Sequence, residues 1–218
     1  MKPAIRVALA GALAGAAFAS QAANSLKQTG WEHGGPANVT VSGAPSNNGN
    51  HPAGEFTGVF NGVSFESYCA DLLQTFSFNT VYTDYTVMSG AAAYGVTKST
   101  QIGELLTAAG GFAASVTASR STAIQAGIWE ILYETGNSFG LGTGTFRAAP
   151  GSVTQADLNV VDGYLANLGS YAATSFTAYV SREHQDFITA VPEPETYALM
   201  LAGLMATGFV ARRKRARS

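Results

Sequence analysis

Cys69 is the single cysteine of this 218-residue chain and the first residue to consider for chemistry. It lies in the segment Tyr68-Cys69-Ala70-Asp71-Leu72, which follows an apolar run. A single cysteine has no partner for an internal disulfide. Four roles remain: a small buried residue, a metal ligand, a nucleophile with a histidine base, and one half of an internal thioester. Such a thioester joins the cysteine sulfur to the side-chain carbonyl carbon of a glutamine and releases ammonia.

Gln125 is the glutamine whose predicted position best fits such a bond. It lies in a predicted helix over residues 121–135, in the sequence Ile124-Gln125-Ala126-Gly127-Ile128-Trp129. Because Gln125 and Trp129 are four residues apart beside the apolar stripe, we expect the amide to point to the edge of the core. A buried amide needs a hydrogen-bond partner, so an ordinary hydrogen-bonded glutamine is the alternative. Gln74 is a second, weaker candidate partner for the cysteine.

These two segments resemble the thioester domain of Gram-positive surface adhesins, which has an aromatic-Cys element and a later Thr-Gln-x-Ala-Ile-Trp element on a helix. Here Ile124 stands in place of Thr and Gly127 in place of Ala. The resemblance covers about residues 56–135. It implies that Cys69 carries the thioester sulfur and that Gln125 supplies the acyl carbon. An amine on a target surface would then attack this carbon and become joined by an amide bond.

We expect no metal site, no cofactor and no enzymatic activity. The three histidines, His33, His51 and His184, are scattered along the chain. The acids lack the spacing of a calcium loop, and neither paired carboxylates nor a triad pattern is visible. Glu130 and Glu134 lie four residues apart in the predicted helix, where we expect a solvated edge rather than an acid pair.

The elements that must position these residues begin with strands. Aromatic and β-branched residues recur with rough alternation from residue 55 to residue 88, and Asn61-Gly62 between two such runs is a hairpin signal. We expect three or four strands there. Residues 34–54 are rich in Gly, Pro, Asn and Ser, which predicts loops around at most one short strand, at 38–42.

Helical periods follow the strands. A short helix is expected over 101–109, a second over 121–135 with Gly136 as its C-cap, and a third after the capping residue Thr154. Alternation returns over 174–190 and predicts a closing strand. The order strands, helices, strand predicts a single α+β domain over residues 23–190.

The N-terminus has the pattern of a secretory signal peptide over residues 1–22. Lys2 and Arg6 precede a short run of apolar and small residues, which ends in small residues before a Ser-Gln-Ala exit. We therefore expect signal peptidase to remove this segment and the domain to be exported.

The C-terminal tail, residues 191–218, has three parts in order. Val191, Pro192, Glu193 and Pro194 form an extended segment, because the prolines restrict the backbone and remove amide donors. An apolar run of 15 residues, 197–211, predicts a membrane helix of roughly 22 Å. The bases that follow orient it with the C-terminus in the cytoplasm. They are Arg212, Arg213, Lys214 and Arg215.

This tail resembles the PEP-CTERM sorting domain of exported proteins of Gram-negative bacteria. Glu195 stands where Ser is more usual. The resemblance implies recognition by exosortase, a membrane enzyme thought to cleave at or near the Pro-Glu-Pro element. It implies a precursor anchored in the inner membrane with its domain in the periplasm, and a product at the cell surface or in the extracellular matrix of a biofilm.

The charge distribution excludes nucleic acid as a partner. The net charge of −2 conceals a middle segment, residues 23–191, with twelve acids and five bases, which leaves no basic face for phosphates. Only 12% of the residues are charged and 46% are apolar, which argues against disorder. The partners that fit are signal peptidase, exosortase, the membrane, and either exopolysaccharide or surface amines.

Overall fold

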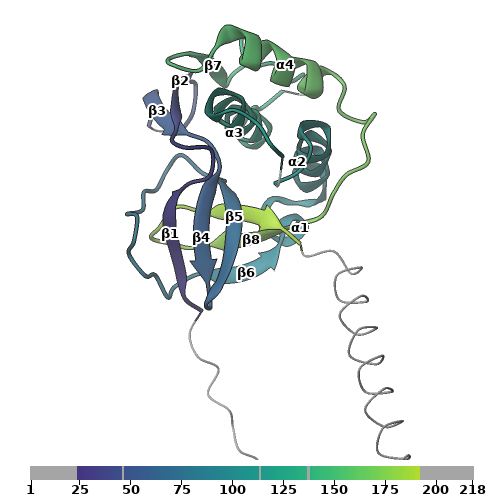
Figure 1. The fold of residues 1–218 in the computed structure, drawn as a ribbon. Helices are drawn as coiled ribbons and strands as arrows, with labels where there is room; N and C mark the ends of the chain where they lie inside the picture. Colours follow the sequence, from purple (N-terminus) through teal and green to yellow (C-terminus); the bar gives the residue numbers. More distant parts are fainter. Residues whose placement is uncertain (1–23, 46, 113, 137, 192–218) are drawn as a thin grey trace, which may run out of the picture.

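The computed structural model describes residues 24–191 except 46, 113 and 137, and Figure 1 presents the fold of this part. Its strands are β1 Leu26–Trp31, β2 Ala37–Ser42, β3 Gly49–Ala53, β4 Phe56–Phe60, β5 Val63–Cys69, β6 Thr86–Ser89, β7 Arg147–Pro150, β8 Phe176–Val180 and β9 Phe187–Ala190. Its helices are α1 Gly90–Tyr94, α2 Val96–Ala109, α3 Ala118–Tyr133 and α4 Gln155–Ala166. The longer helices gather at one end of the molecule and the larger sheet lies at the other (Figure 1).

The larger sheet is antiparallel and has the strand order β1-β4-β5-β9-β8-β6. Its β4–β5 hairpin turns at Asn61 and Gly62, whose φ angles of 49° and 85° are the positive values that a tight hairpin needs. The last strand, β9, lies in the middle of this sheet, between β5 and β8. Cys69 at the end of β5 is therefore paired with Phe187 at the start of β9.

The smaller sheet, in the order β3-β2-β7, packs against helix α3. Thr122 on α3 connects the two, because its hydroxyl accepts a hydrogen bond from the N–H of Ala37 (3.1 Å) and donates one to the carbonyl of Ala53 (2.5 Å). This joins the helix to β2 and β3 at once.

Helix α3 is the centre of the helical layer. It begins after Thr117, whose hydroxyl accepts a hydrogen bond from the N–H of Arg120, and its residues 121–131 are buried. A Cβ atom at Gly127 would lie 2.8 Å from Val161 of α4 and 3.0 Å from Leu105 of α2. The absence of a side chain at Gly127 therefore allows three helices to approach one another.

The predicted α+β class is confirmed, with its strand-rich first part and its closing strand. The hairpin, the strand at 38–42 and the cap at Thr154 also occur as predicted. Among the described residues the helices number four rather than two or three, because Gly90–Tyr94 adds a short one and Ser89 caps it. The loop prediction for residues 34–54 missed β3, whose Pro52 is tolerated because β3 is an edge strand.

The predicted membrane helix, residues 197–211, lies outside the described residues. Within the described part of the chain, every helix is too short or too polar to cross a membrane.

Candidate functional site

Cys69 is buried at the end of β5, and the side chain of Gln125 holds its backbone. The N–H of Cys69 donates to Oε1 of Gln125 (2.8 Å), and Nε2 of Gln125 donates to the carbonyl of Cys69 (2.7 Å). Gln125 itself is fully buried on α3. The structure thus brings together the two residues singled out in the sequence. Both ends of the Gln125 amide are engaged by the Cys69 backbone rather than by its sulfur.

The sulfur of Cys69 has a different glutamine beside it. Nε2 of Gln185 contacts Sγ of Cys69 directly, and the thiol donates to the carbonyl of Asp71 (2.6 Å). Burial raises the pKa of the Cys69 thiol well above its usual range, and the nearby Asp71 raises it further. The cysteine is therefore held as a neutral thiol against a side-chain amide.

Gln185 is held at several atoms. Its backbone carbonyl accepts a hydrogen bond from the hydroxyl of Tyr85 (2.7 Å), and its backbone N–H donates to the carbonyl of Thr75 (3.4 Å). Its side-chain nitrogen also donates to the carbonyl of Asp71 (3.2 Å). The antiparallel pairing of β5 with β9 continues past Cys69, since the N–H of Ala70 donates to the carbonyl of Asp186 (2.8 Å). This pairing carries Gln185 to the sulfur.

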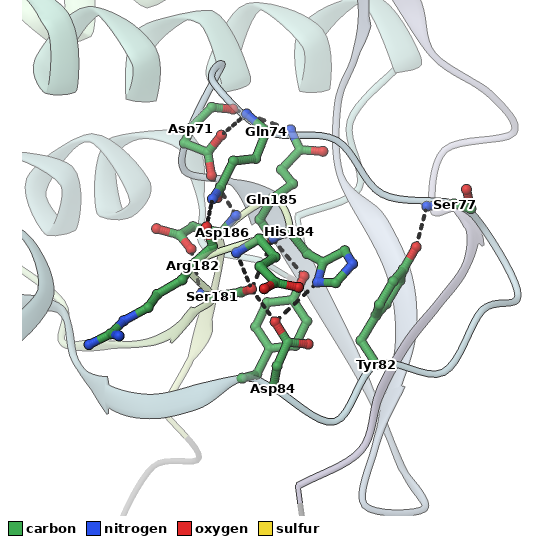
Figure 2. A network of polar contacts seen from close by, with 12 residues as sticks. Asp71, Gln74, Ser77, Tyr82, Asp84, Ser181, Arg182, His184, Gln185 and Asp186 are labelled. Carbon is green, nitrogen blue, oxygen red and sulfur yellow. Dashed lines mark hydrogen bonds and ion pairs between the residues drawn. The ribbon is translucent and has the colours of Figure 1, made fainter.

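The turn before Gln185 is shaped by a polar network, which Figure 2 shows. The hydroxyl of Ser181 accepts from the N–H groups of Glu183 (3.0 Å) and His184 (2.9 Å), and it donates to Asp84. His184 forms an ion pair with the same carboxylate through Nδ1 (3.0 Å). The turn over residues 181–186 is therefore tied to the segment before β6.

Two carboxylates complete this network, the buried Asp71 and the half-buried Asp186. Asp71 accepts from the N–H groups of Leu73 (2.9 Å), Gln74 (3.0 Å) and Asp186 (2.6 Å). Asp186 in turn accepts from the N–H of Ser181 (2.8 Å). Burial raises the pKa of Asp186 to about 6, and the charge of Asp71 contributes to the rise. These carboxylates hold the loop after β5 and the turn before β9 in one arrangement.

A cavity of about 270 Å³ opens onto Cys69 and Gln185. Cys69, Gln125, Trp129 and Gln185 are among the residues that line it. The cysteine and two glutamines thus lie along one cavity that is open to solvent.

Gln185 was not among the candidate residues predicted from the sequence. The residue lies in a turn without periodicity, and its neighbour in space is 116 positions away in the sequence. One signal was present: Gln185 comes directly before the predicted closing strand, and a strand that pairs next to the cysteine would bring it there. The weaker candidate, Gln74, instead donates to the carbonyl of Arg182 (2.6 Å).

The prediction that Glu130 and Glu134 form a solvated edge of the helix now labelled α3 is wrong, because Glu130 is fully buried and Glu134 is only 7% exposed. The chain after α3 folds back over this face and donates backbone N–H groups to both carboxylates. Glu130 accepts from Gly140 (2.8 Å), and Glu134 accepts from Thr145 (2.7 Å). Burial raises the pKa of Glu130 to about 7.

Each of the three histidines contacts a different residue: His33 pairs with Glu55, His51 with the carbonyl of Asn47, and His184 with Asp84. In the part of the chain that the structure describes, no three metal-ligating side chains form a group.

Of the sorting tail, only Val191 belongs to the described residues, and it is 39% exposed. Pro192, Glu193, Pro194 and the basic residues Arg212, Arg213, Lys214 and Arg215 lie outside them.

Comparison with known proteins locates one match. Residues 190–215 match the PEP-CTERM protein-sorting motif. No curated protein and no solved structure matches the chain, and the resemblance to adhesin thioester domains is not supported by them. The motif supports an exported protein that is targeted to an exosortase, with a precursor anchored in the membrane before processing.

Proposed function

We propose that residues 23–191 form a non-enzymatic domain that is released at the cell surface or into the extracellular matrix when exosortase removes the tail. The observation that carries this proposal is the match of residues 190–215 to the sorting motif. The position of the last strand supports it as well. β9 ends at Ala190, so cleavage near Pro192 leaves every described strand intact.

Truncation after Ala190 tests the sorting proposal in a host that has the exosortase. The full chain should appear first in the inner membrane and then as a shortened product outside the cell. The truncated chain should be secreted without either step. A matched control replaces the four bases at 212–215 by Ser, which keeps the Pro-Glu-Pro element but removes the positive end. Identical fractionation of the full and truncated chains would refute the proposal.

We further propose that Cys69 forms an internal thioester, with Gln185 rather than Gln125 as its partner. The contact between Nε2 of Gln185 and the Cys69 sulfur supports this choice. The amide of Gln125 is already paired with the Cys69 backbone at both ends. A bond from the sulfur to Gln185 leaves those hydrogen bonds in place.

Formation of the thioester and its reaction with an amine are both acyl substitutions at Cδ of Gln185. In formation, Sγ attacks Cδ of Gln185, the C–N bond breaks, and the thiol proton leaves with the nitrogen as ammonia. In use, a primary amine attacks the same carbon and the C–S bond breaks. The amine proton then returns to the sulfur, so the products are an amide at Gln185 and a free thiol at Cys69. The domain would become covalently joined to a surface amine.

Intact-mass measurement of the exported full chain, purified in detergent, tests the thioester. The wild type should be lighter than its sequence by one ammonia. Cys69→Ala and Gln185→Ala should have their full calculated masses, whereas Gln74→Ala, altered in the same cavity, should keep the deficit. After treatment with methylamine, peptide mapping should locate the label at Gln185. An undiminished wild-type mass, or a label at Gln125, would overturn the assignment.

A further inference from the structure

The cavity above Cys69 passes from a buried floor to an open rim. Ala53, Cys69 and Trp129 are buried at its floor, while Asn47, Pro52 and Phe78 are exposed at its rim. Gln185 is half-buried between these levels. A substrate that enters from solvent would thus reach the proposed thioester at the inner end.

One wall of the cavity is aromatic. The rings of Trp31 and Phe56 are tilted by 30° with their centroids 4.3 Å apart, and Phe76 and Phe78 meet edge to face at 5.0 Å. The two pairs also contact each other, with Phe56 and Phe76 at 5.3 Å. These rings pack on one another and therefore form a fixed apolar surface that leads down from Phe78 at the rim.

The polar side chains that line the cavity are four amides, one hydroxyl, one thiol, two indoles and one histidine, and no Asp, Glu, Lys or Arg is among its described lining residues. At the floor, the buried indole N–H of Trp129 faces the Cys69 sulfur, a weak acceptor, and makes no other hydrogen bond among the described residues. A carbonyl oxygen held at this point would be a better partner for this donor.

We propose that this cavity is the substrate site of the thioester and that it selects a primary amine carried on an unbranched alkyl stem. The inference rests on the proposed bond between Cys69 and Gln185. The stem would lie against the aromatic wall, and the nitrogen would meet Cδ of Gln185 at the inner end. Burial of methylene groups favours such a stem, whereas an anionic stem finds no Lys or Arg among the described lining residues.

Two kinds of molecule share this chemistry: a lysine side chain and a free linear amine. Their reactive ends are the same, but a lysine brings a polypeptide backbone to the rim, near Asn47 and Pro52. The experiment therefore includes both a diamine and a lysine peptide blocked at its termini. Faster reaction of the blocked peptide than of the diamine assigns the rim to polypeptide targets; the reverse order assigns the site to free amines.

Aminolysis rates measured by intact mass on the purified full chain test the proposal. Butylamine and methylamine have similar basicity, and each rate is divided by the rate of the same amine with a free alkyl thioester. We expect this normalised rate to be about tenfold higher for butylamine, because three more methylene groups are each about half-buried against the open wall. β-Alanine, an amine with an anionic end, should react more slowly than methylamine.

Phe78→Ala removes the outer part of the wall and should reduce the butylamine preference over methylamine to about twofold. Val81→Ala is the matched control, since Val81 is 58% exposed and does not line the cavity. Equal normalised rates for all amines, with the ammonia deficit present, would overturn the substrate site and leave the thioester standing. Absence of the deficit in the wild type would overturn both.

Discussion

Two regions of the molecule hold Cys69, and they do so in different ways. On one side, helix α3 presents Gln125, which is fully buried and bonds the peptide groups on both sides of the cysteine. On the other side, the turn at 181–186 presents Gln185, which is half-buried and touches the sulfur. The first contact holds the backbone in place, and the second places an amide against the sulfur, where the proposed thioester would form.

The difference follows from how each region is supported. Helix α3 is rigid because its own hydrogen bonds and the packing of α2 and α4 around Gly127 define it. The turn lacks such regular structure. It depends on Ser181, Asp71 and Asp186, whose side chains replace the missing backbone ladder. A site built from both would combine a cysteine held by a helix with a glutamine whose position a few side chains set.

The largest expected effect is the difference in stability between the protein with its thioester intact and the protein with its thioester opened. A thioester between Cys69 and Gln185 closes a loop of 116 residues, which should stabilise the fold by about 4 kcal/mol through the unfolded chain. Methylamine opens this bond and should lower the free energy of unfolding by that amount. Chemical denaturation before and after treatment measures it. Cys69→Ala, which has no bond to open, should be indifferent to methylamine; an equal loss in this variant would contradict the cross-link.

The next effect distinguishes the two glutamines as supports. In a Cys69→Ala background, where no thioester forms, Gln125→Ala leaves a buried N–H and a buried carbonyl without partners. Each such group costs about 1–3 kcal/mol, so the free energy of unfolding should fall by about 3 kcal/mol. Gln185→Ala in the same background should lower it by less than about 1 kcal/mol, because its site is open to water. Thermal denaturation of both variants checks this order, and equal losses would show that the two regions contribute alike.

A smaller effect probes the helix side alone. Gly127→Ala restores the residue of the adhesin pattern, but its Cβ would lie 2.8 Å from Val161 and 3.0 Å from Leu105. Such overpacking typically destabilises by about 1–3 kcal/mol, and flexible side-chain ends place this case near 1 kcal/mol. The melting temperature should fall while the mass deficit stays. Loss of the deficit in this variant would mean that the spacing of the helices also positions the turn.

The smallest effect probes the turn side through its pH dependence. The pKa of Asp186 is raised to about 6 in the folded protein, so its charged form is disfavoured there. Its contribution to stability is therefore greatest below the unfolded pKa of about 3.9 and is lost as the pH rises through 6. The side chain of Asp186→Asn does not titrate, so between pH 4 and pH 7 the free energy of unfolding of this variant should fall by about 1 kcal/mol less than that of the wild type. Partial solvent access keeps the difference this small. Melting temperatures of both proteins at pH 4 and pH 7 test it; parallel shifts would contradict the assignment.

The fold was predictable where local chemistry decides it. Asn61-Gly62 can adopt the positive φ angles of a tight turn, and Thr154 can cap a helix, so both appear in the structure as expected. The strand β3 was not predictable, since its Gly, Asn and Pro are typical of loops and only pairing with β2 makes it a strand. Burial of Glu130 was also hidden, because the chain that covers it follows later in the sequence.

The candidate site divides in the same way. Periodicity along α3 places Gln125 on the same face as Trp129, and that is a local property of a helix. Gln185 has no periodic neighbours. It meets the sulfur only because β9 enters the sheet beside β5 and not at an edge. A strand order of this kind depends on contacts across more than a hundred residues, which no window of sequence contains.

The sequence by itself determined the sorting motif at residues 190–215 and has the pattern of a signal peptide at the other end, because both are local features that are recognisable without a fold. It also determined that the single cysteine has no partner for an internal disulfide. The tertiary structure alone decided which glutamine touches the sulfur and which one holds the backbone. The physical reason is that hydrogen bonds between strands and buried side chains are long-range, so they exist only once the chain has closed on itself.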